Sequence, residues 1–511
     1  MSTAKKIIAA TSGAAGGGGL NVEDVFSTFA YTGTGSSLAI NNGIDLDGEG
    51  GLVWLKQRDV RTRGHYFTDT VRGNTKRVSS NDAEPEATGS DFITSFNNNG
   101  FSIGVTNNIN QSGAAFASWS FRKAPGFFDV VTYTGNDTNG RQISHALGST
   151  PGMVIVKRTD GGTDNWTVQH RSLGGTKSLF LNLTNAEDVS ASEWNNTAAT
   201  STVFTVGTSG KTNGNGNTYV AYIFAHDDAS FGTNEDESII KCGTYAGNGS
   251  TTAGPEIDLG FEPQWLMVKR TDSNDSSNSA YHSWIIQDNM RGLSAPPYTN
   301  AGGYNNLLFA NSIVAEGKRG NGTGAANTQT QLLITPTGFT VQSGSTEFNG
   351  NGGTYIYMAI RRPNKPPTAG TEVYKAIIGN DTNAMSTGFT VDMSLAGKHL
   401  AQFYNFIAID RLRGGRLLVT NDKDDEYVEA DFDLAFATND GLNGRQWFNN
   451  AAATNHFFKR TPGFFDVVAY SGTSSARNQD HGLGVAAELI IVKARDGQYN
   501  MNWFTGPFTP G

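Results

Sequence analysis

The chain contains a single cysteine, Cys242, among its 511 residues. One cysteine excludes an intrachain disulfide framework and a cysteine-based zinc site. Apolar packing and strand ladders must therefore hold the fold, as suits a protein assembled in a reducing cytoplasm. Charged residues make up 17% of the chain, and no apolar run approaches the about 20 residues that a transmembrane helix needs. We therefore expect neither a disulfide-stapled domain nor membrane insertion, and interpret Cys242 as a small buried hydrophobic residue.

Signals of catalysis are also scarce. The eight histidines show no H-x-H or H-E-x-x-H spacing, and no strand-to-helix nucleophile elbow is recognisable. His145 and His481 precede the same Leu-Gly turn in two repeats, which indicates a turn role. A carboxylate pair for glycoside hydrolysis cannot be chosen by spacing, because separation in space decides it. We expect no catalytic residue, no cofactor and no metal, and interpret Asp45 and Asp47 as a loop pair.

The net charge of −9 gives no reason to expect a nucleic-acid partner. Residues 1–20 are rich in glycine and begin with a basic pair, but their apolar stretch is too short for a secretory signal. They carry too few apolar side chains to fold alone. We expect this segment to dock on another protein.

What the sequence does have is repetition. The segment Arg122–Gly135, with the letters RKAPGFFDVVTYTG, returns as Lys459–Gly472, with the letters KRTPGFFDVVAYSG. Weaker copies of its apolar strand and its Tyr-x-Gly ending open further units between them. A second phrase follows each opening, as in Met153–Asp160 (MVIVKRTD). Periodicity of this kind indicates a scaffold or binding array rather than a catalyst.

The phrases divide the chain into units of about 110 residues, the size of one β-sandwich. We predict an all-β protein of tandem antiparallel sandwiches with separate cores in series. The predicted boundaries are a docking segment at 1–20, sandwiches at 21–124, 125–236, 237–367 and 368–461, and a partial sandwich at 462–511. Each complete unit is predicted to end in a hairpin, as at 201–207 and 217–224, across a loop rich in Asn and Gly.

The ends of the second phrases and the tryptophans allow specific expectations. The short apolar runs predict buried strands, and the basic residues at their ends, such as Lys157, are expected in solvent. Trp166, Trp284 and Trp503 follow these phrases and are expected in the core. Trp194 lies in a polar stretch away from the repeated phrases. It could stack on a sugar, anchor a partner or cap its own sandwich.

Unit four differs from units two and three but shares a phrase with unit one. Asp410–Gly414 matches Asp69–Gly73, and both are followed by a similar polar turn. This match pairs unit four with unit one, and the long repeat pairs unit five with unit two. The sequence therefore predicts a cycle of three units with a second round begun. Unit five lacks the final phrases of the other units, so we expect either further chain or a neighbouring subunit to complete it.

These phrases resemble virion structural proteins of marine tailed phages, cyanophages especially. The resemblance rests on the opening residues 4–19, on PGFFDVV, on LGSTPGMVIVKRT and on NTYVAYIF, and it covers units one to three and five better than unit four. It implies a tail or fibre component whose repeats are similar to the concanavalin or laminin-G jelly roll. It carries no catalytic motif.

We therefore expect a phage tail appendage, assembled in the host cytoplasm and located in the virion. Its N-terminal segment would dock on other tail proteins, and its sandwiches would reach or support contact with a host glycan or receptor through many weak contacts. The resemblance alone implies a homo-oligomer, with a trimer expected. Two alternatives stay open: a carbohydrate-binding or polysaccharide-depolymerising protein, and a purely structural capsid or collar decoration.

Overall fold

The computed structural model describes residues 19–60, 63–273, 282–293, 307–316, 332–379, 384–398, 405–414, 416–427, 436, 438–443, 453–497 and 499–506. The chain is all-β, and the named strand pairs of these residues are antiparallel. The helices of the described residues are single turns: α2 (Val22–Val25), α3 (Asn107–Asn110), α4 (Ala191–Trp194), η1 (Asn289–Arg291) and η2 (Gly370–Glu372). None of the helices in the described part of the chain is long and apolar enough to cross a membrane.

Unit one shows the plan that units one to four share. A six-stranded sheet has the order β1 (Phe26–Thr32), β9 (Ala115–Arg122), β3 (Gly51–Gln57), β4 (His65–Asp69), β5 (Lys76–Ser79), β6 (Ala87–Thr88). A smaller sheet has the order β2 (Leu38–Asn41), β8 (Gly100–Ile103), β7 (Ile93–Asn97). The opening strand β1 pairs with the closing strand β9, which lies between it and the second strand β3.

Units two and three repeat this order. In unit two the larger sheet is β10 (Phe128–Thr134), β17 (Thr218–Phe224), β12 (Met153–Arg158), β13 (Thr167–His170), β14 (Lys177–Phe180), β15 (Asp188–Val189), and β11 (Arg141–Ser144) pairs with β16 (Val203–Val206). In unit three it is β18 (Ile240–Ala246), β25 (Thr354–Arg361), β20 (Pro263–Arg270), β21 (Ile285–Asp288), β22 (Leu308–Phe309), and the smaller sheet is β19 (Glu256–Asp258), β24 (Gly338–Val341), β23 (Leu332–Thr335).

Unit four follows the same order, and the described part of unit five contains one hairpin. The larger sheet of unit four is β26 (Tyr374–Ile378), β32 (Ala453–Phe458), β28 (Met393–Lys398), β29 (Ile407–Asp410), β30 (Leu417–Val419), with β27 (Ala384–Met385) paired to β31 (Leu442–Asn443). In unit five β33 (Leu489–Val492) pairs with β34 (Asn502–Thr505).

The predicted closing hairpins are wrong. β16 pairs with β11 in the smaller sheet, whereas β17 lies in the larger sheet between β10 and β12. The Asn-Gly-rich loop crosses between the sheets because Asn213 clamps it from inside: its Nδ2 donates to the carbonyls of Gly207 at 2.7 Å and Thr138 at 2.9 Å. Asn and Gly residues predict a chain reversal, but they do not say which sheet the chain enters next.

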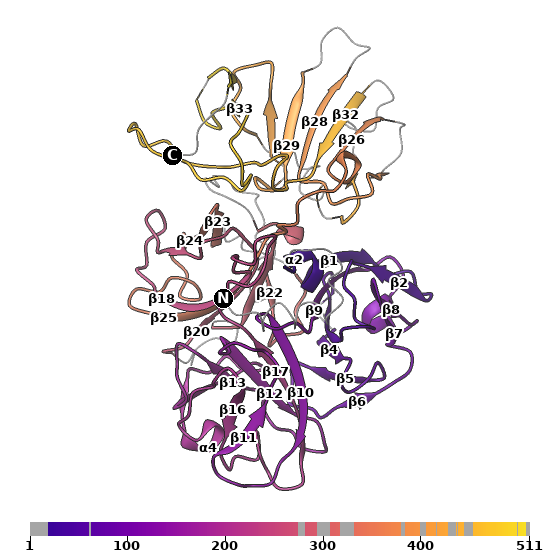
Figure 1. The fold of residues 1–511 in the computed structure, drawn as a ribbon, viewed down its shortest axis with the longest axis vertical. Coiled ribbons are helices and arrows are strands. Elements are labelled where there is room, and N and C mark those ends of the chain that lie inside the picture. The colour runs from indigo at the N-terminus through magenta and orange to yellow at the C-terminus, as the bar shows by residue number, and fades with distance from the viewer. Residues whose placement is uncertain are drawn as a thin grey trace.

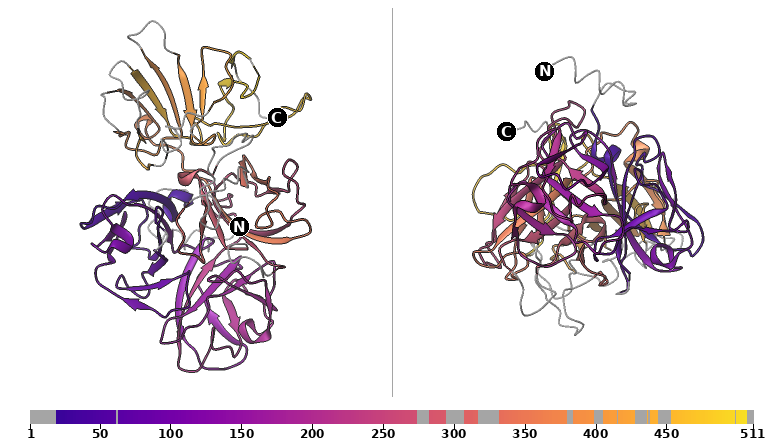
Figure 2. Two further views of the ribbon diagram at one scale, coloured as in Figure 1. Left: turned by 180° about the vertical axis from the view of Figure 1, so that it is seen from behind. Right: turned by 90° about the horizontal axis from the view of Figure 1, so that it is seen from below.

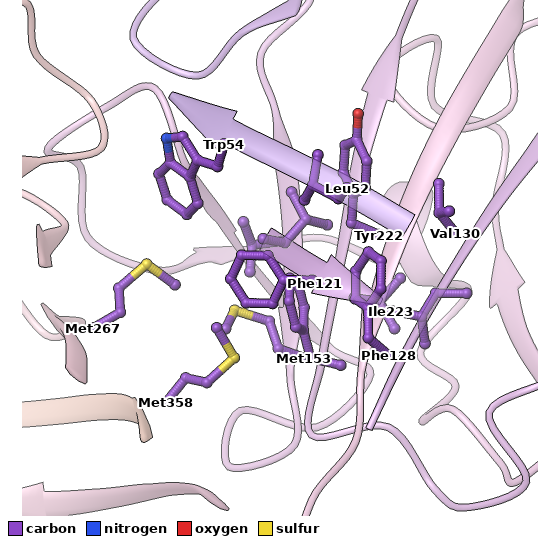
Figure 3. Packing of buried hydrophobic residues seen from close by; sticks show 14 of the residues in the cluster. Leu52, Trp54, Phe121, Phe128, Val130, Met153, Tyr222, Ile223, Met267 and Met358 are labelled. Carbon is purple, nitrogen blue, oxygen red and sulfur yellow. The ribbon is translucent and has the colours of Figure 1, made fainter. Parts of the chain in front are cut away.

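The expectation of separate cores in series is incomplete for units one to three, because units one and three have cores of their own but a further core is shared by all three. Their larger sheets share one apolar cluster. Figure 3 shows Met267 and Met358 of unit three pointing toward Phe121 of unit one and Met153 of unit two. Aromatic rings join the units, with centroid distances of 5.4 Å for Phe121–Phe224 and 6.3 Å for Phe121–Trp265.

The burial of the second strands explains the common core. All seven residues of β3 are buried, and β12 and β20 are buried up to their last residue. Side chains alternate between the two faces of a strand, so both faces of each larger sheet are covered. One face packs on the smaller sheet of its own unit, and the other packs on neighbouring units. The prediction that the second phrases form buried strands is confirmed in units one to three and is wrong for β33 of unit five, none of whose four residues is buried.

Units one to three surround this core, and units four and five lie beyond them along the long axis of the molecule (Figures 1 and 2). Ion pairs connect the two layers. Arg460 donates to both carboxylate oxygens of Glu262, at 2.7 and 2.6 Å, and Arg362 lies 3.2 Å from Asp466. The repeats therefore form a ring of three sandwiches with a second layer on one side.

Because the core is shared, we expect Met267→Ala to weaken all three units of the ring. The substitution should lower the free energy of unfolding by about 2–5 kcal/mol, and hydrogen exchange should accelerate together in β3, β12 and β20. The matched control is Ile334→Ala, in the separate core of unit three, which should act mainly on unit three. Faster exchange confined to unit three in the Met267 variant would contradict a common core.

Candidate functional site at the seams between sandwiches

Units one, two and three meet at three seams, and at two of them a tryptophan of one unit contacts the backbone of the preceding unit. Trp166 Nε1 of unit two donates to the Ser79 carbonyl of unit one at 2.9 Å. Trp284 Nε1 of unit three donates to the Phe180 carbonyl of unit two at 2.9 Å. Both tryptophans are buried, which confirms their predicted place in the core. Trp503 pairs with Ile491 in β34, but its side chain lies outside the described residues.

His65 occupies the corresponding position in unit one. Its Nδ1 accepts a hydrogen bond from Trp54 Nε1 at 2.9 Å. An accepting Nδ1 places the proton of the neutral ring on Nε2. Burial, with the nearby cations Lys56 and Arg291, lowers the pKa of His65 well below its ordinary value. The ring is therefore a neutral packing element.

An asparagine holds each of these ring-bearing residues in place. The backbone N–H of the ring-bearing residue donates to the asparagine Oδ1 in four units: His65 to Asn81 at 2.7 Å, Trp166 to Asn182 at 3.0 Å, Trp284 to Asn311 at 2.9 Å, and Phe406 to Asn421 at 2.8 Å. The repeated contact shows that these four positions are equivalent, although histidine, tryptophan and phenylalanine fill them.

A lysine also crosses each seam between the three sandwiches. Its ammonium donates to a neighbouring unit's carbonyl: Lys56 to Ile313 at 3.2 Å, Lys157 to Ala83 at 2.8 Å, and Lys269 to Thr184 at 3.2 Å. The expectation that these basic strand ends lie in solvent is wrong, since at most 1% of each residue is exposed. Burial lowers the pKa values of Lys56 and Lys157 to about 8 and that of Lys269 to about 7.

A backbone hydrogen bond completes the seams and links unit four to unit five in the same way. The N–H groups of Glu86, Glu187, Glu316 and Glu426 donate to the carbonyls of Thr159 (3.0 Å), Thr271 (2.8 Å), Arg58 (2.6 Å) and Arg495 (2.8 Å). The first three contacts join units one to two, two to three and three to one. The fourth joins units four and five, so the second layer reproduces the first seam.

The Asp-x-x-Arg-Gly turns belong to the same seams. In unit one Asp69 Oδ2 accepts from Arg72 Nε at 2.7 Å and from the Tyr222 hydroxyl of unit two at 3.0 Å. In unit three Asp288 Oδ2 accepts from Trp119 Nε1 of unit one at 3.0 Å. Removing one partner from a buried ion pair leaves an uncompensated charge. These carboxylates are therefore structural anchors rather than candidates for acid or base catalysis.

The seam between units one and two opens outward as a groove of about 360 Å³. Its lining combines exposed hydroxyls, two tyrosines and an ion pair: Arg72, Lys76, Glu86, Thr132, Tyr133, Thr134, Thr159, Thr218 and Tyr219. The rings of Tyr133 and Tyr219 stack on each other at 5.1 Å, and Arg141 lies over Tyr133. Little ring surface remains for stacking on a sugar, so hydrogen bonding is the chemistry that this groove offers.

The next seam carries the same groove residues. Thr244, Tyr245, Thr271, Thr354 and Tyr355 stand at the positions of Thr132, Tyr133, Thr159, Thr218 and Tyr219. The seam between units three and one differs, because Arg58 replaces the threonine and reaches Glu316 at 2.6 Å.

A second cavity, of about 210 Å³, lies where units one, three and four meet. Its charged side chains include Glu262, Asp392, Arg411 and Arg460. Arg460 is bound to Glu262, and Arg411 lies 3.4 Å from Asp392 and donates to the Val391 carbonyl at 2.8 Å. In the described part of the chain, no group of three or more His, Cys, Asp or Glu side chains could hold a metal ion.

Trp194 does not form an exposed contact site. It is the last residue of α4 and is fully buried, so of the three alternatives packing within its own sandwich holds, and stacking on a sugar or anchoring a partner does not. The polar residues around it begin and end a helical turn: Ser190 Oγ accepts from the Ser192 N–H at 3.2 Å, and Asn195 has a left-handed backbone. Because the helical turn is capped at both ends, the Trp194 side chain can point into the interior although its neighbours in the sequence are polar.

The other sequence interpretations fall on structural positions. Cys242 is fully buried, and burial raises the pKa of its thiol well above the ordinary value. His145 and His481 use Nδ1 to accept the N–H of Leu147 and Leu483, both at 3.3 Å, so both hold a turn as predicted. The seam lysines were missed, although the sequence held a signal: lysine recurs at one position of the second phrase while its neighbour varies.

The buried lysines predict a pH dependence. Their folded pKa values of about 7 to 8 lie below the unfolded value, so between these the unfolded chain holds more protons and stability rises with pH. We expect the free energy of unfolding to increase from pH 7 to pH 9, by at most about 1.4 kcal/mol per pH unit for each lysine. Lys269→Met should reduce this slope.

The measurement is chemical denaturation at pH 7, 8 and 9. Lys375→Met is the matched control, because Lys375 is exposed and its loss should leave the slope unchanged. A flat profile in the parent chain would show that the seam lysines are not held in a destabilised charged form.

Comparison with known proteins identifies one family. No curated protein and no solved structure matches the chain. A family model described as a domain of unknown function, DUF7483, matches residues 21–363, which span the three sandwiches of the ring. The chain therefore belongs to the DUF7483 family.

Proposed function

We propose that this protein is a structural component of a phage tail that builds or supports a host-attachment appendage. The sequence resemblance supports a place in the phage particle, and the arrangement of the sandwiches supports a mechanical role. In this proposal the N-terminal segment docks on other tail proteins. Its residues 1–18 lie outside the described residues.

The ring of three sandwiches is the observation that carries this proposal. Each seam repeats a buried ring-to-carbonyl or lysine-to-carbonyl contact and a backbone hydrogen bond. Units four and five then begin a second layer with the same seam contact. A chain that closes one ring and starts another grows along an axis, which suits a shaft or spacer. The three-unit repetition also gives one chain an approximately threefold arrangement of similar surfaces.

The polar groups of the seams fit this mechanical role. Buried charges and lysines are costly unless they are paired and hydrogen-bonded. Here the carboxylate of Asp69 and the ammonium of Lys157 each have partners in an adjacent unit. Such contacts fix the rotation of one sandwich against the next, and a rigid appendage requires fixed rotation.

Location on the particle tests the proposal. Antibodies against the full chain should label the tail of intact particles, and mass spectrometry should find the chain in purified virions. Labelling of the capsid shell would favour a decoration protein instead. Absence of the chain from purified particles would exclude a virion role.

The groove between units one and two favours glycan binding as a second candidate function. Its exposed threonine hydroxyls and its Lys76–Glu86 ion pair at 2.8 Å are polar groups that can hydrogen-bond sugar hydroxyls. At the next seam Thr244 and Thr354 are exposed and Thr271 is buried, so a second weak site there could add to binding through these two hydroxyls.

For this candidate we expect the full chain to bind one class of glycan on an array and Thr159→Arg to weaken that binding. The substitution copies Arg58 of the third seam, so the fold already accepts arginine at the equivalent position. Thr252→Arg, in an exposed turn of unit three, is the control. Equal binding by the parent and the Thr159 variant would remove the groove from consideration.

A further inference from the structure

Unit five begins its fold as unit two does. Asp466 caps the opening: its Oδ1 accepts the Val467 N–H at 3.0 Å and its Oδ2 accepts the Gly482 N–H at 2.6 Å. Asp129 makes the same two contacts in unit two, with the N–H groups of Val130 at 2.9 Å and Ala146 at 2.7 Å. The start of the sandwich is therefore in place.

The middle of the sheet differs. In unit two the opening strand β10 pairs with β17, and β17 pairs with β12. In unit five residues 466–471 form no strand, and β33 pairs with β34 alone among the described strands. Leu489 and Ile491 of β33 are 48% and 42% exposed, whereas their unit-two equivalents, Met153 and Ile155, are 2% and 1% exposed.

The surroundings of Tyr470 are a second, independent observation about the position of the closing strand. Its unit-two equivalent, Tyr133, stacks on Tyr219 of the closing strand at 5.1 Å, with Arg141 over the ring at 5.6 Å. In unit five Arg477 lies over Tyr470 at 5.4 Å, as Arg141 does over Tyr133. Tyr470 itself is 43% exposed. Among the described residues the cation over Tyr470 is in place, and no aromatic residue of a closing strand stacks on it.

We propose that the opening segment 465–471 and β33 together form a slot that binds one extended polypeptide strand. The strand would lie between them, antiparallel to both, as the closing strands do in units one to four. One occupant explains two observations: the opening segment without a ladder, and Tyr470 without the aromatic partner that Tyr133 has. Main-chain pairing to an open sheet edge is a general mode of peptide binding. The inference does not depend on the proposed function.

The pairing of unit two fixes the sequence that fits the slot. Tyr219 pairs with Tyr133, Tyr222 with Ile155, and Phe224 with Met153. Transferred to unit five, the occupant needs an aromatic residue opposite Tyr470 and, three and five residues later, large apolar residues opposite Ile491 and Leu489. The closing strands of the described units are already paired within their own sheets. The partner is therefore an additional segment with this aromatic and apolar pattern.

A synthetic peptide of residues 217–225, with the sequence NTYVAYIFA, tests the slot. We expect saturable binding to the full chain with one site per chain, measured by fluorescence anisotropy of the labelled peptide. Hydrogen exchange should slow at 465–471 and 489–492 when the peptide is bound. A scrambled peptide of the same composition should not bind. A peptide with proline in place of Tyr222 should also fail, because proline lacks the N–H that the ladder requires.

Two variants of the chain separate the slot from general adhesion. Ile491→Lys should weaken peptide binding by about tenfold or more, because the lysine would face the apolar side chains of the strand. Tyr499→Lys is the matched control, since Tyr499 is 65% exposed in the connection between β33 and β34, and it should leave binding unchanged. Binding of the scrambled peptide with equal affinity, equal binding by the Ile491 variant, or no binding by the parent chain would each overturn the proposal.

Discussion

The position of the closing strand is the constraint on which the rest of this structure depends. In unit two β17 lies between two other strands and is buried at six of its seven positions. A strand buried on both faces requires a cover on each side of its sheet. The smaller sheet of the same unit covers one face only. The other face needs a different partner. In units one to three it packs against the corresponding faces of the other two units.

The polar groups of the seams follow from that packing. In a ring of sheets, the strand ends and turns of one unit lie against the backbone of the adjacent unit. The buried carbonyls of that backbone need hydrogen-bond donors. Lysine near the end of the second strand and tryptophan just before the next strand supply those donors across the seam. Each contact is modest by itself, but its recurrence at successive seams orients each sandwich against the next. The cost is visible in Lys269, whose ammonium is held where burial lowers its pKa to about 7.

The same logic explains why units four and five differ from the ring. Phe406 holds the position of Trp166, as its asparagine contact shows, yet it is 55% exposed. Leu395 and His456, on the face of unit four that corresponds to the shared core, are only partly buried. The seam between units four and five is formed, while Phe406, Leu395 and His456 are less buried among the described residues than their equivalents in the first ring.

Much of the fold could be predicted from the sequence. The β-branched and aromatic runs determined antiparallel strands, the repeated phrases determined the equivalence of the units, and the match of Asp410–Gly414 to Asp69–Gly73 indicated the three-unit cycle that the seam between units four and five follows. These features are local, because they depend on residue type and spacing. Several decisions came only from tertiary structure: the placement of β16 and β17 in different sheets, the burial of Lys157, the inward turn of Trp194, and the equivalence of His65 with Trp166. Each of these depends on which distant part of the chain the residue packs against. The amino-acid pattern specifies that a face must be buried, but it does not specify the surface that covers it.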